Sequence, residues 1–468
     1  MPGGRSNRAI PPAPPLSDSG LSGHGRLQEK PRCCPLLEET LKIKGLRWWI
    51  IVLICLGTVV NYLARNSLGV MAPILKTEMN FTTQEYSYVV AAFQLAYTVM
   101  QPVCGYIVDF LGLKIGFALF AVLWSVSNCL HGFATGWVSL ALFRGMLGLT
   151  EAAAIPSGIK AVGEWFPKQE RSVAVGWFNA GTSLGAMLAP PLVVYVQMQH
   201  GWSAAFIVTG ALGFVFAALW WLFYRSPGEH PNITAEEHAY IVAGQNPPVV
   251  GADGVRAKPK VKEILSTKRF WGIAIPRFLA EPAWQTFSFW IPLYLATERG
   301  MDIKQIAMFA WMPFLAADFG GILGGYLSPF FMKHFKFSVV NSRLAGIVIG
   351  AICMIGPGLI GLATDAYTAI ALFCIGGFAH QMISALINTL SADVFESHEV
   401  ATANGLTGMA SWTGGLTFSL IVGALATTIG FAPLFVCLTV FDLIGACVAI
   451  ALLRDRGDKA PAGIAAAR

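Results

Sequence analysis

Among the charged side chains inside apolar runs of this 468-residue sequence, three could bind an ion or a polar substrate: Arg65, Arg144 and Glu151. Arg144 and Glu151 are seven residues apart, which is about 10.5 Å and nearly two turns of a helix, so a helix would present both on one face. Arg65 follows Asn61 and Tyr62 in an earlier apolar run. Burying any of these charges in lipid costs several kcal/mol, and charges at membrane depth usually line paths for ions or polar substrates. We therefore expect all three charges to face a polar cavity.

Polar side chains also form stripes in two later apolar runs. The first stripe, at helical spacing, is Arg277, Glu281, Gln285 and Ser288. The second stripe is His380, Ser384 and Asn388, with Gln381 beside it. Such stripes suit a polyhydroxylated ligand. For Ser384 and Asn388, hydrogen bonding between packed helices explains the pattern equally well.

The composition indicates what kind of protein must position these residues. Hydrophobic residues make up 55% of the chain and charged residues only 12%, about half of what a soluble domain carries. This balance argues against a soluble enzyme, a secreted disulfide scaffold and a nucleic-acid binder. The nine cysteines are mostly scattered singly through apolar stretches and show no metal-ligand spacing, so we expect no metal site.

Apolar runs long enough to cross a bilayer recur along the chain. Their expected bounds are 46–72, 83–108, 113–133, 137–162, 171–199, 202–224, 269–297, 303–332, 339–362, 366–392, 400–429 and 431–453. The sequence therefore predicts an all-α membrane protein with twelve transmembrane helices in two six-helix bundles, 42–224 and 269–454. The charged stretch 225–268 is expected to be a cytoplasmic linker. Residues 1–41, rich in Pro, Gly and Ser, are expected to be a disordered cytoplasmic tail, and 455–468 a second cytoplasmic tail.

The positions of Lys and Arg predict the orientation. With the N-terminus inside, 25 of these residues lie in inner loops and tails and only three in outer loops. Because basic residues favour the cytoplasmic side, we expect both termini to be cytoplasmic.

Short motifs recur at corresponding places in the two halves. Gly105-Tyr106 ends the second span, and Gly325-Tyr326 ends the eighth. The fifth and eleventh spans also begin alike, with the matching sets Glu170, Ala174, Gly176 and Glu399, Ala403, Gly405. Parallel six-helix halves around a central site describe the major facilitator architecture.

The loop after the second span resembles the major facilitator signature G-x-x-x-D-x-x-G-x-[RK]. Its signature positions are Gly105, Asp109, Gly112 and Lys114. The resemblance implies a gating latch on the cytoplasmic face, in which Asp109 accepts hydrogen bonds from helix N-terminal amides or from a basic partner. The alternative is a solvated turn. Phe110 stands where many members carry a basic residue, which implies a thinner charge network.

Tyr62-Leu-Ala-Arg65 and Arg144-x6-Glu151 resemble the anion:cation symporter branch of this superfamily. That branch includes bacterial sugar-acid carriers and vesicular glutamate and sialic acid carriers. The resemblance implies that Arg65 binds the substrate carboxylate and that Glu151, beside Arg144, takes up the coupled proton. The alternative is a permanent buried ion pair that holds two helices together. The expected substrate-binding residues are Arg65, Tyr62, Tyr97, Arg277, Gln285, His380, Gln381 and Asn404.

Longer strings resemble the hexuronate carriers of this branch over residues 42–454. Examples are Lys42–Trp48, Pro276–Trp284, Gly376–Gln381 and Val400–Met409. The resemblance implies proton-coupled import of galacturonate and glucuronate by alternating access across a bacterial inner membrane. The rival functions are symport of another sugar acid (an aldonate or aldarate), a transporter-derived sensor, or a passive channel.

The expected partners follow from this interpretation. They are a sugar-acid anion, a co-transported proton and the lipid bilayer, with no nucleic acid and no cofactor. No P-loop is present in the sequence, so ATP drive is not indicated. No constellation of nucleophile, base and metal indicates an enzyme. We expect a monomer.

Overall fold

The computed structural model describes residues 42–245, 258–289, 291, 294–295, 298–301, 305, 308–309 and 311–454. Both expected tails, 1–41 and 455–468, and the middle of the expected linker lie outside the described residues. Within the described part the chain is helical, and its one isolated β-bridge joins Ile43 to Ile233. The prediction of an all-α fold is confirmed.

The helices follow the apolar runs. The N-terminal half forms α1 (Leu46–Glu78), α2 (Thr83–Leu111), α3 (Leu113–His131), α4 (Trp137–Glu151), α5 (Ala154–Trp165) and α6 (Arg171–Phe223). Two short helices, α7 (Ala235–Ala243) and α8 (Val261–Ser266), follow. The C-terminal half forms α9 (Lys268–Phe289), α12 (Met312–Phe335), α13 (Val339–Cys353), α14 (Ile355–Gly358), η2 (Ile360–Leu362), α15 (Ala366–Val394), α16 (Val400–Ile429) and α17 (Ala432–Leu453). In the described residues, eight helices are long and apolar enough to cross a membrane.

Two breaks interrupt the helices of the N-terminal half, the first where the sequence predicts it and the second inside an expected span. Gly201, at φ 83°, interrupts α6 and so separates the fifth span from the sixth. The fourth span is divided between α4 and α5, and Glu151 is the last residue of α4. Pro156 follows in the first turn of α5, and its missing N–H removes one hydrogen bond across this break. The break places Glu151 at a helix end inside the membrane span.

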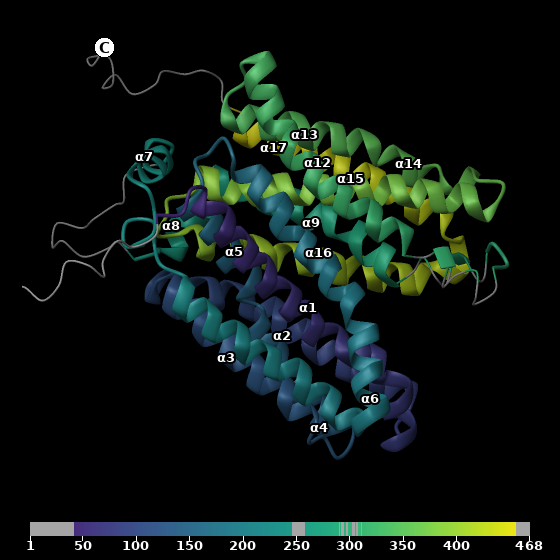
Figure 1. The fold of residues 1–468 in the computed structure, drawn as a ribbon. Coiled ribbons are helices and arrows are strands. Elements are labelled where there is room, and N and C mark those ends of the chain that lie inside the picture. Colours follow the sequence, from purple (N-terminus) through teal and green to yellow (C-terminus); the bar gives the residue numbers. More distant parts are fainter. Residues whose placement is uncertain are drawn as a thin grey trace, which may run out of the picture. The chain divides into compact units, whose positions relative to one another are not determined.

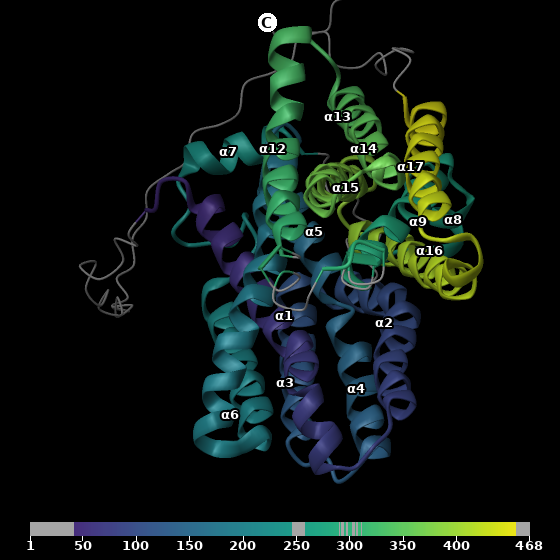
Figure 2. The same cartoon turned by 90° about the vertical axis from the view of Figure 1, so that its right-hand side faces the viewer.

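The described helices form two bundles, α1–α6 in purple to teal and α9–α17 in green to yellow (Figures 1 and 2). We call the end that holds Lys42, the α2–α3 turn and α7 the linker end, and the end that holds the α1–α2 connection the hairpin end. The bundles meet where α2 packs against α16 and where α6 packs against α12.

Glycines permit both crossings between the bundles. A side chain at Gly105 or Gly405 would collide with the backbone of the facing helix in the α2–α16 pair. In the α6–α12 pair, a Cβ at Gly176 would lie 2.6 Å from the Gly321 carbonyl oxygen, and one at Gly325 would lie 2.5 Å from the Ser172 carbonyl oxygen. The glycines of the internal sequence repeat therefore mark the two places where the halves touch backbone to backbone.

The linker is attached to the N-terminal half through α7. Glu237 of α7 accepts hydrogen bonds from the backbone N–H groups of Leu46 and Arg47, at 2.9 and 3.2 Å. A carboxylate at these otherwise unsatisfied amides stabilises the start of α1. Arg47 also ion-pairs with Glu237 and with Glu170, each at 2.9 Å. The first helix and the linker are thus held together at the linker end.

Candidate substrate-binding cavity

A cavity of about 730 Å³ lies between the two bundles. Its volume is in the range of pockets that bind small organic ligands. On the N-terminal side α1, α2, α4 and α6 contribute Tyr62, Arg65, Asn66, Leu68, Gly69, Tyr86, Val90, Phe93, Gln94, Arg144, Thr182, Ser183, Ala186, Met187 and Pro190. The C-terminal side contributes Trp284, Gln285, Trp311, Phe314, Leu315 and Trp412. These residues lie on the hairpin side of the glycine crossings, so the cavity extends toward the hairpin end.

Arg65 is the cationic centre of the N-terminal wall. Its Nε donates to Glu151 Oε2 at 2.9 Å, and its Nη2 donates to Asn61 Oδ1 at 3.3 Å. The guanidinium carbon lies over the rings of Tyr62 and Tyr97, at 4.5 and 4.8 Å from their centroids. Aromatic faces attract a cation while leaving the rest of the guanidinium able to bind an anion. Three site residues predicted from the sequence, Tyr62, Tyr97 and Glu151, therefore contact Arg65.

Glu151 and Arg144 do not pair with each other. Glu151 forms its ion pair with Arg65 of α1, and its side chain is fully buried. Arg144 donates from Nη2 to the Arg65 carbonyl oxygen at 2.8 Å and stacks its charge on Phe93, 4.5 Å from the ring centroid. Four nearby buried atoms have no hydrogen-bond partner in the described part of the chain: Glu151 Oε1, Arg144 Nε and Nη1, and Asn61 Nδ2. These atoms of Glu151, Arg144 and Asn61 therefore remain able to form further hydrogen bonds.

Three polar residues of the C-terminal half, Arg277, Glu281 and Asn404, form hydrogen bonds to other side chains of the same half. Arg277 Nη1 donates to Thr407 Oγ1 at 2.9 Å, and Glu281 Oε2 accepts from Ser411 Oγ at 2.7 Å. Both contacts join α9 to α16. Asn404 is buried and donates to Asn388 Oδ1 at 3.2 Å. Arg277, Glu281 and Asn404 are not among the residues that line the cavity.

Of the predicted C-terminal residues, Gln285 alone is among the residues that line the described cavity. His380 lies one layer behind it, stacked on the lining residue Trp284 with ring centroids 5.5 Å apart. Gln381 is buried and packs near Gly321 of α12. Asn388 donates to Ser384 within α15 at 3.4 Å, and its Oδ1 accepts from Asn404 of α16 at 3.2 Å. The second contact is a bond between packed helices, in agreement with that interpretation for Asn388.

Asp109 of the turn motif forms a contact between the halves. It accepts from the backbone N–H and the hydroxyl of Thr402 at 2.7 Å each, in the first turn of α16. Its ion-pair partner is Lys160 of α5, which also donates to the Ser397 carbonyl at 3.1 Å. Asp109 therefore has both kinds of partner expected for a latch. Gly112, at φ 83°, makes the turn into α3.

Lys114 takes no part in this contact. Its ammonium lies over the Trp221 ring at 5.2 Å, within the N-terminal half. Lys160, rather than Lys114, is therefore the basic residue that pairs with Asp109. In the sequence, Lys160 stands out as a lysine inside an apolar run. The spacing of the motif does not connect this lysine to Asp109.

A second contact between the halves was not predicted. Asp393, at the end of α15, ion-pairs with Arg171 of α6 at 3.2 Å and with Arg343 of α13 at 3.1 Å. Arg343 also donates to Ser172 Oγ at 3.0 Å and to the Lys168 carbonyl. Together with Asp109, Lys160 and Thr402, these residues close the linker end. Other residues missed from the sequence are the cavity residues Gln94, Trp284 and Trp412, of which Gln94 lies three positions before Tyr97.

Comparisons with known proteins agree with this architecture. Residues 54–357 match the model of the Major Facilitator Superfamily. The chain is 54% identical over 415 residues to the hexuronate transporter of Escherichia coli K12, covering 89% of this chain and 96% of that protein. It is 51% identical over 330 residues to the galacturonate transporter of Dickeya chrysanthemi, covering 70% and 95%.

A solved structure supports the fold. The crystal structure of the major facilitator transporter FucP in the outward conformation matches with a TM-score of 0.67 at 12% identity, covering 87% of this chain and all of that chain. The predicted fold is confirmed, and this multi-pass membrane protein belongs to the major facilitator superfamily.

Proposed function

We propose that this protein is a proton-coupled symporter that imports the hexuronates galacturonate and glucuronate across a bacterial inner membrane. The two relatives named for hexuronate and galacturonate transport support the substrate class. A cavity lined by the guanidinium groups of Arg65 and Arg144, by aromatic side chains and by amide groups suits a small sugar that carries a carboxylate.

The ion pair of Arg65 with Glu151 carries the proposal, because it offers a direct coupling of proton and substrate. While Glu151 is ionised, its carboxylate neutralises the guanidinium that the substrate needs. A proton on Glu151 removes that negative charge and leaves Arg65 to bind the sugar acid. Proton binding then favours anion binding, and the reverse holds by linkage.

The cavity and the closed linker end correspond to one state of an alternating-access cycle. The basic residues predict that the linker end is cytoplasmic, so a cavity toward the hairpin end faces outward. Inward opening then requires α2 to leave α16 and α6 to leave α12. The contacts of Asp109 with Thr402 and of Asp393 with Arg171 must break in that step.

The proposal includes one proton for each hexuronate. Some sugar-acid symporters of this branch carry an Asp before the first-span Arg, whereas this chain has Ala64, which cannot titrate. Glu281 and His380 are the competing second sites. Glu281 is bound by Ser411 and, at 3.5 Å, by Gln285 rather than by Arg277.

The test is uptake of radiolabelled galacturonate into proteoliposomes under an imposed pH gradient, inside alkaline. We expect accumulation above the external concentration and competition by glucuronate. Stronger competition by galactonate or glucarate would assign the protein to another sugar acid. Uptake that only equilibrates would indicate a channel, and binding without uptake would indicate a sensor.

A further inference from the structure

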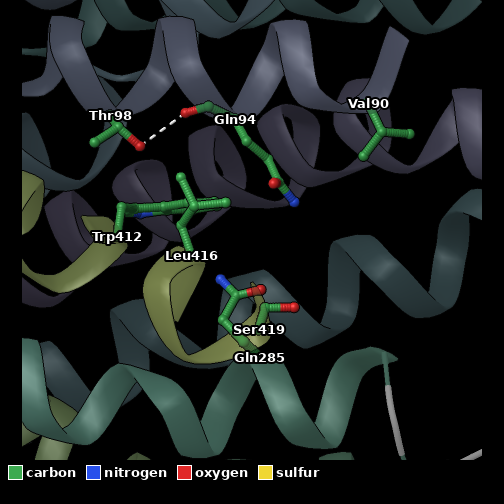
Figure 3. Close-up of a pocket in the computed structure, with 7 residues that line it drawn as sticks. All are labelled: Val90, Gln94, Thr98, Gln285, Trp412, Leu416 and Ser419. Atoms are coloured by element: carbon green, nitrogen blue, oxygen red, sulfur yellow. Dashed lines mark hydrogen bonds between the residues drawn. The ribbon is translucent and has the colours of Figure 1, made fainter. Parts of the chain in front are cut away.

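A side pocket of about 210 Å³ adjoins the main cavity (Figure 3). It lies between α2 of the N-terminal half and α9 and α16 of the C-terminal half. Its lining residues are Val90, Gln94, Thr98, Gln285, Trp412, Leu416 and Ser419, of which Val90, Gln94, Gln285 and Trp412 also line the main cavity. A ligand in the main cavity can therefore extend into this pocket.

Two amide side chains point into the side pocket from opposite halves, Gln94 from α2 and Gln285 from α9 (Figure 3). The Gln94 amide has no hydrogen-bond partner in the part of the chain that the structure describes. The Gln285 amide makes one contact, to Glu281, at the long distance of 3.5 Å. The hydroxyl of Thr98, by contrast, donates to the Gln94 main-chain oxygen at 2.7 Å. The two amides therefore hold the uncommitted donors and acceptors of the pocket.

A series of ring contacts connects this pocket to the anion-binding guanidinium. The Arg65 guanidinium lies 4.8 Å from the Tyr97 ring centroid, and the Tyr97 ring lies 4.7 Å from the Trp412 ring. Trp412 is part of both pockets. Tyr97 itself is buried behind the cavity wall. A sugar acid with its carboxylate on Arg65 would thus extend through the main cavity toward Trp412, with its hydroxyls toward the amides.

We propose that the side pocket is a hydroxyl-recognition subsite in which Gln94 and Gln285 determine specificity among sugar acids. An amide offers two donors and an acceptor, which match hydroxyl groups that both donate and accept. Trp412 supplies an apolar face for the C–H side of the sugar. This inference rests on the proposed function, because it concerns how the same cavity selects its substrate.

Binding of a panel of hexuronates, each lacking one hydroxyl, to Gln94→Met and Gln285→Met variants tests the proposal. Methionine has a similar shape but cannot replace the amide hydrogen bonds. We expect each variant to bind galacturonate about three- to tenfold more weakly, as for the loss of one or two hydrogen bonds. Each variant should bind one deoxy acid as well as the unaltered protein does, because that acid lacks the hydroxyl the amide recognises.

Thr417→Val is the matched control on α16, because Thr417 lines neither pocket and its hydroxyl donates to the Thr413 main-chain oxygen at 2.8 Å. We expect this variant to bind every acid of the panel as the unaltered protein does. Gln94→Asn, which keeps the amide on a shorter side chain, should lie between the unaltered protein and Gln94→Met. Equal weakening of every acid in the panel, loss of all binding, or unchanged galacturonate binding in both Met variants would overturn the subsite. Absence of any hexuronate binding to the unaltered protein would instead contradict the proposed function.

Discussion

The two halves carry the same residue types at their centres but use them differently. In the N-terminal half, Arg65 and Glu151 form an ion pair at the cavity, next to buried atoms without partners. In the C-terminal half, Arg277 and Glu281 lie one turn apart on α9, yet each is bound by a hydroxyl of α16. An ion pair that a proton can open suits a coupling site, whereas hydroxyl-bound charges suit a fixed wall. The predictions below test this division.

The largest expected effect is from Glu151→Gln. Glutamine resembles the protonated carboxyl, so the variant should still bind and exchange galacturonate but lose accumulation driven by a pH gradient. Counterflow and pH-driven uptake in proteoliposomes separate these activities. Glu281→Gln is the matched variant in the other half and should still concentrate substrate. If Glu151→Gln also concentrates substrate, the coupling site lies elsewhere, with Glu281 and His380 next.

Arg65→Lys should weaken hexuronate binding by more than about tenfold although it keeps the charge. An ammonium cannot reproduce the bidentate contact of a guanidinium with a carboxylate. Equilibrium binding of radiolabelled galacturonate measures the change. Near-normal affinity in this variant would contradict the assignment of Arg65 to the carboxylate.

Asp109→Asn should reduce uptake about tenfold while substrate binding from the hairpin end is retained. The change removes the nearer of the two carboxylates beside buried Lys160, leaving Glu164 at 4.0 Å, and weakens a contact that holds the linker end closed. Comparison of initial uptake rates with equilibrium binding checks this separation. Lys114→Gln is the control, and a loss as large as that of Asp109→Asn would restore Lys114 to the latch.

Arg277→Lys should weaken galacturonate binding only about threefold, because Arg277 contacts Thr407 and a carbonyl of α16 rather than lining the cavity. The measurement is the same binding assay as for Arg65→Lys. A loss equal to that of Arg65→Lys would show that the C-terminal half also binds the carboxylate.

The smallest expected effect is that of membrane potential, which should leave accumulation unchanged. One proton and one monoanion carry no net charge together. The test imposes an inside-negative potential with valinomycin and potassium at equal pH on both sides. Accumulation driven by potential alone would require a second proton, and would place Glu281 or His380 of the C-terminal half in the coupling path.

The sequence predicted the residues that meet at the N-terminal centre but not how they pair. Residue types and spacing placed Tyr62 and Arg65 at the cavity and buried Glu151 against Arg65, because charges cannot face lipid. The same spacing suggested that Arg144 lies beside Glu151, whereas the helix end at Glu151 turns its carboxylate toward α1. Similarly, the motif spacing suggested Lys114 for the latch, and the structure has Lys160 there.

The sequence by itself determined the membrane class, the helical fold and the repeat, because bilayer thickness and lipid polarity constrain every span independently. Only the tertiary structure decided which polar groups remain available to a ligand. Asn404 and Arg277 are polar like Gln94 and Gln285, but the packing of α16 against α9 and α15 uses the Asn404 amide nitrogen and Nη1 of Arg277. Each donor or acceptor forms its hydrogen bond with the neighbour that helix packing brings within about 3 Å, and the local sequence does not specify that neighbour.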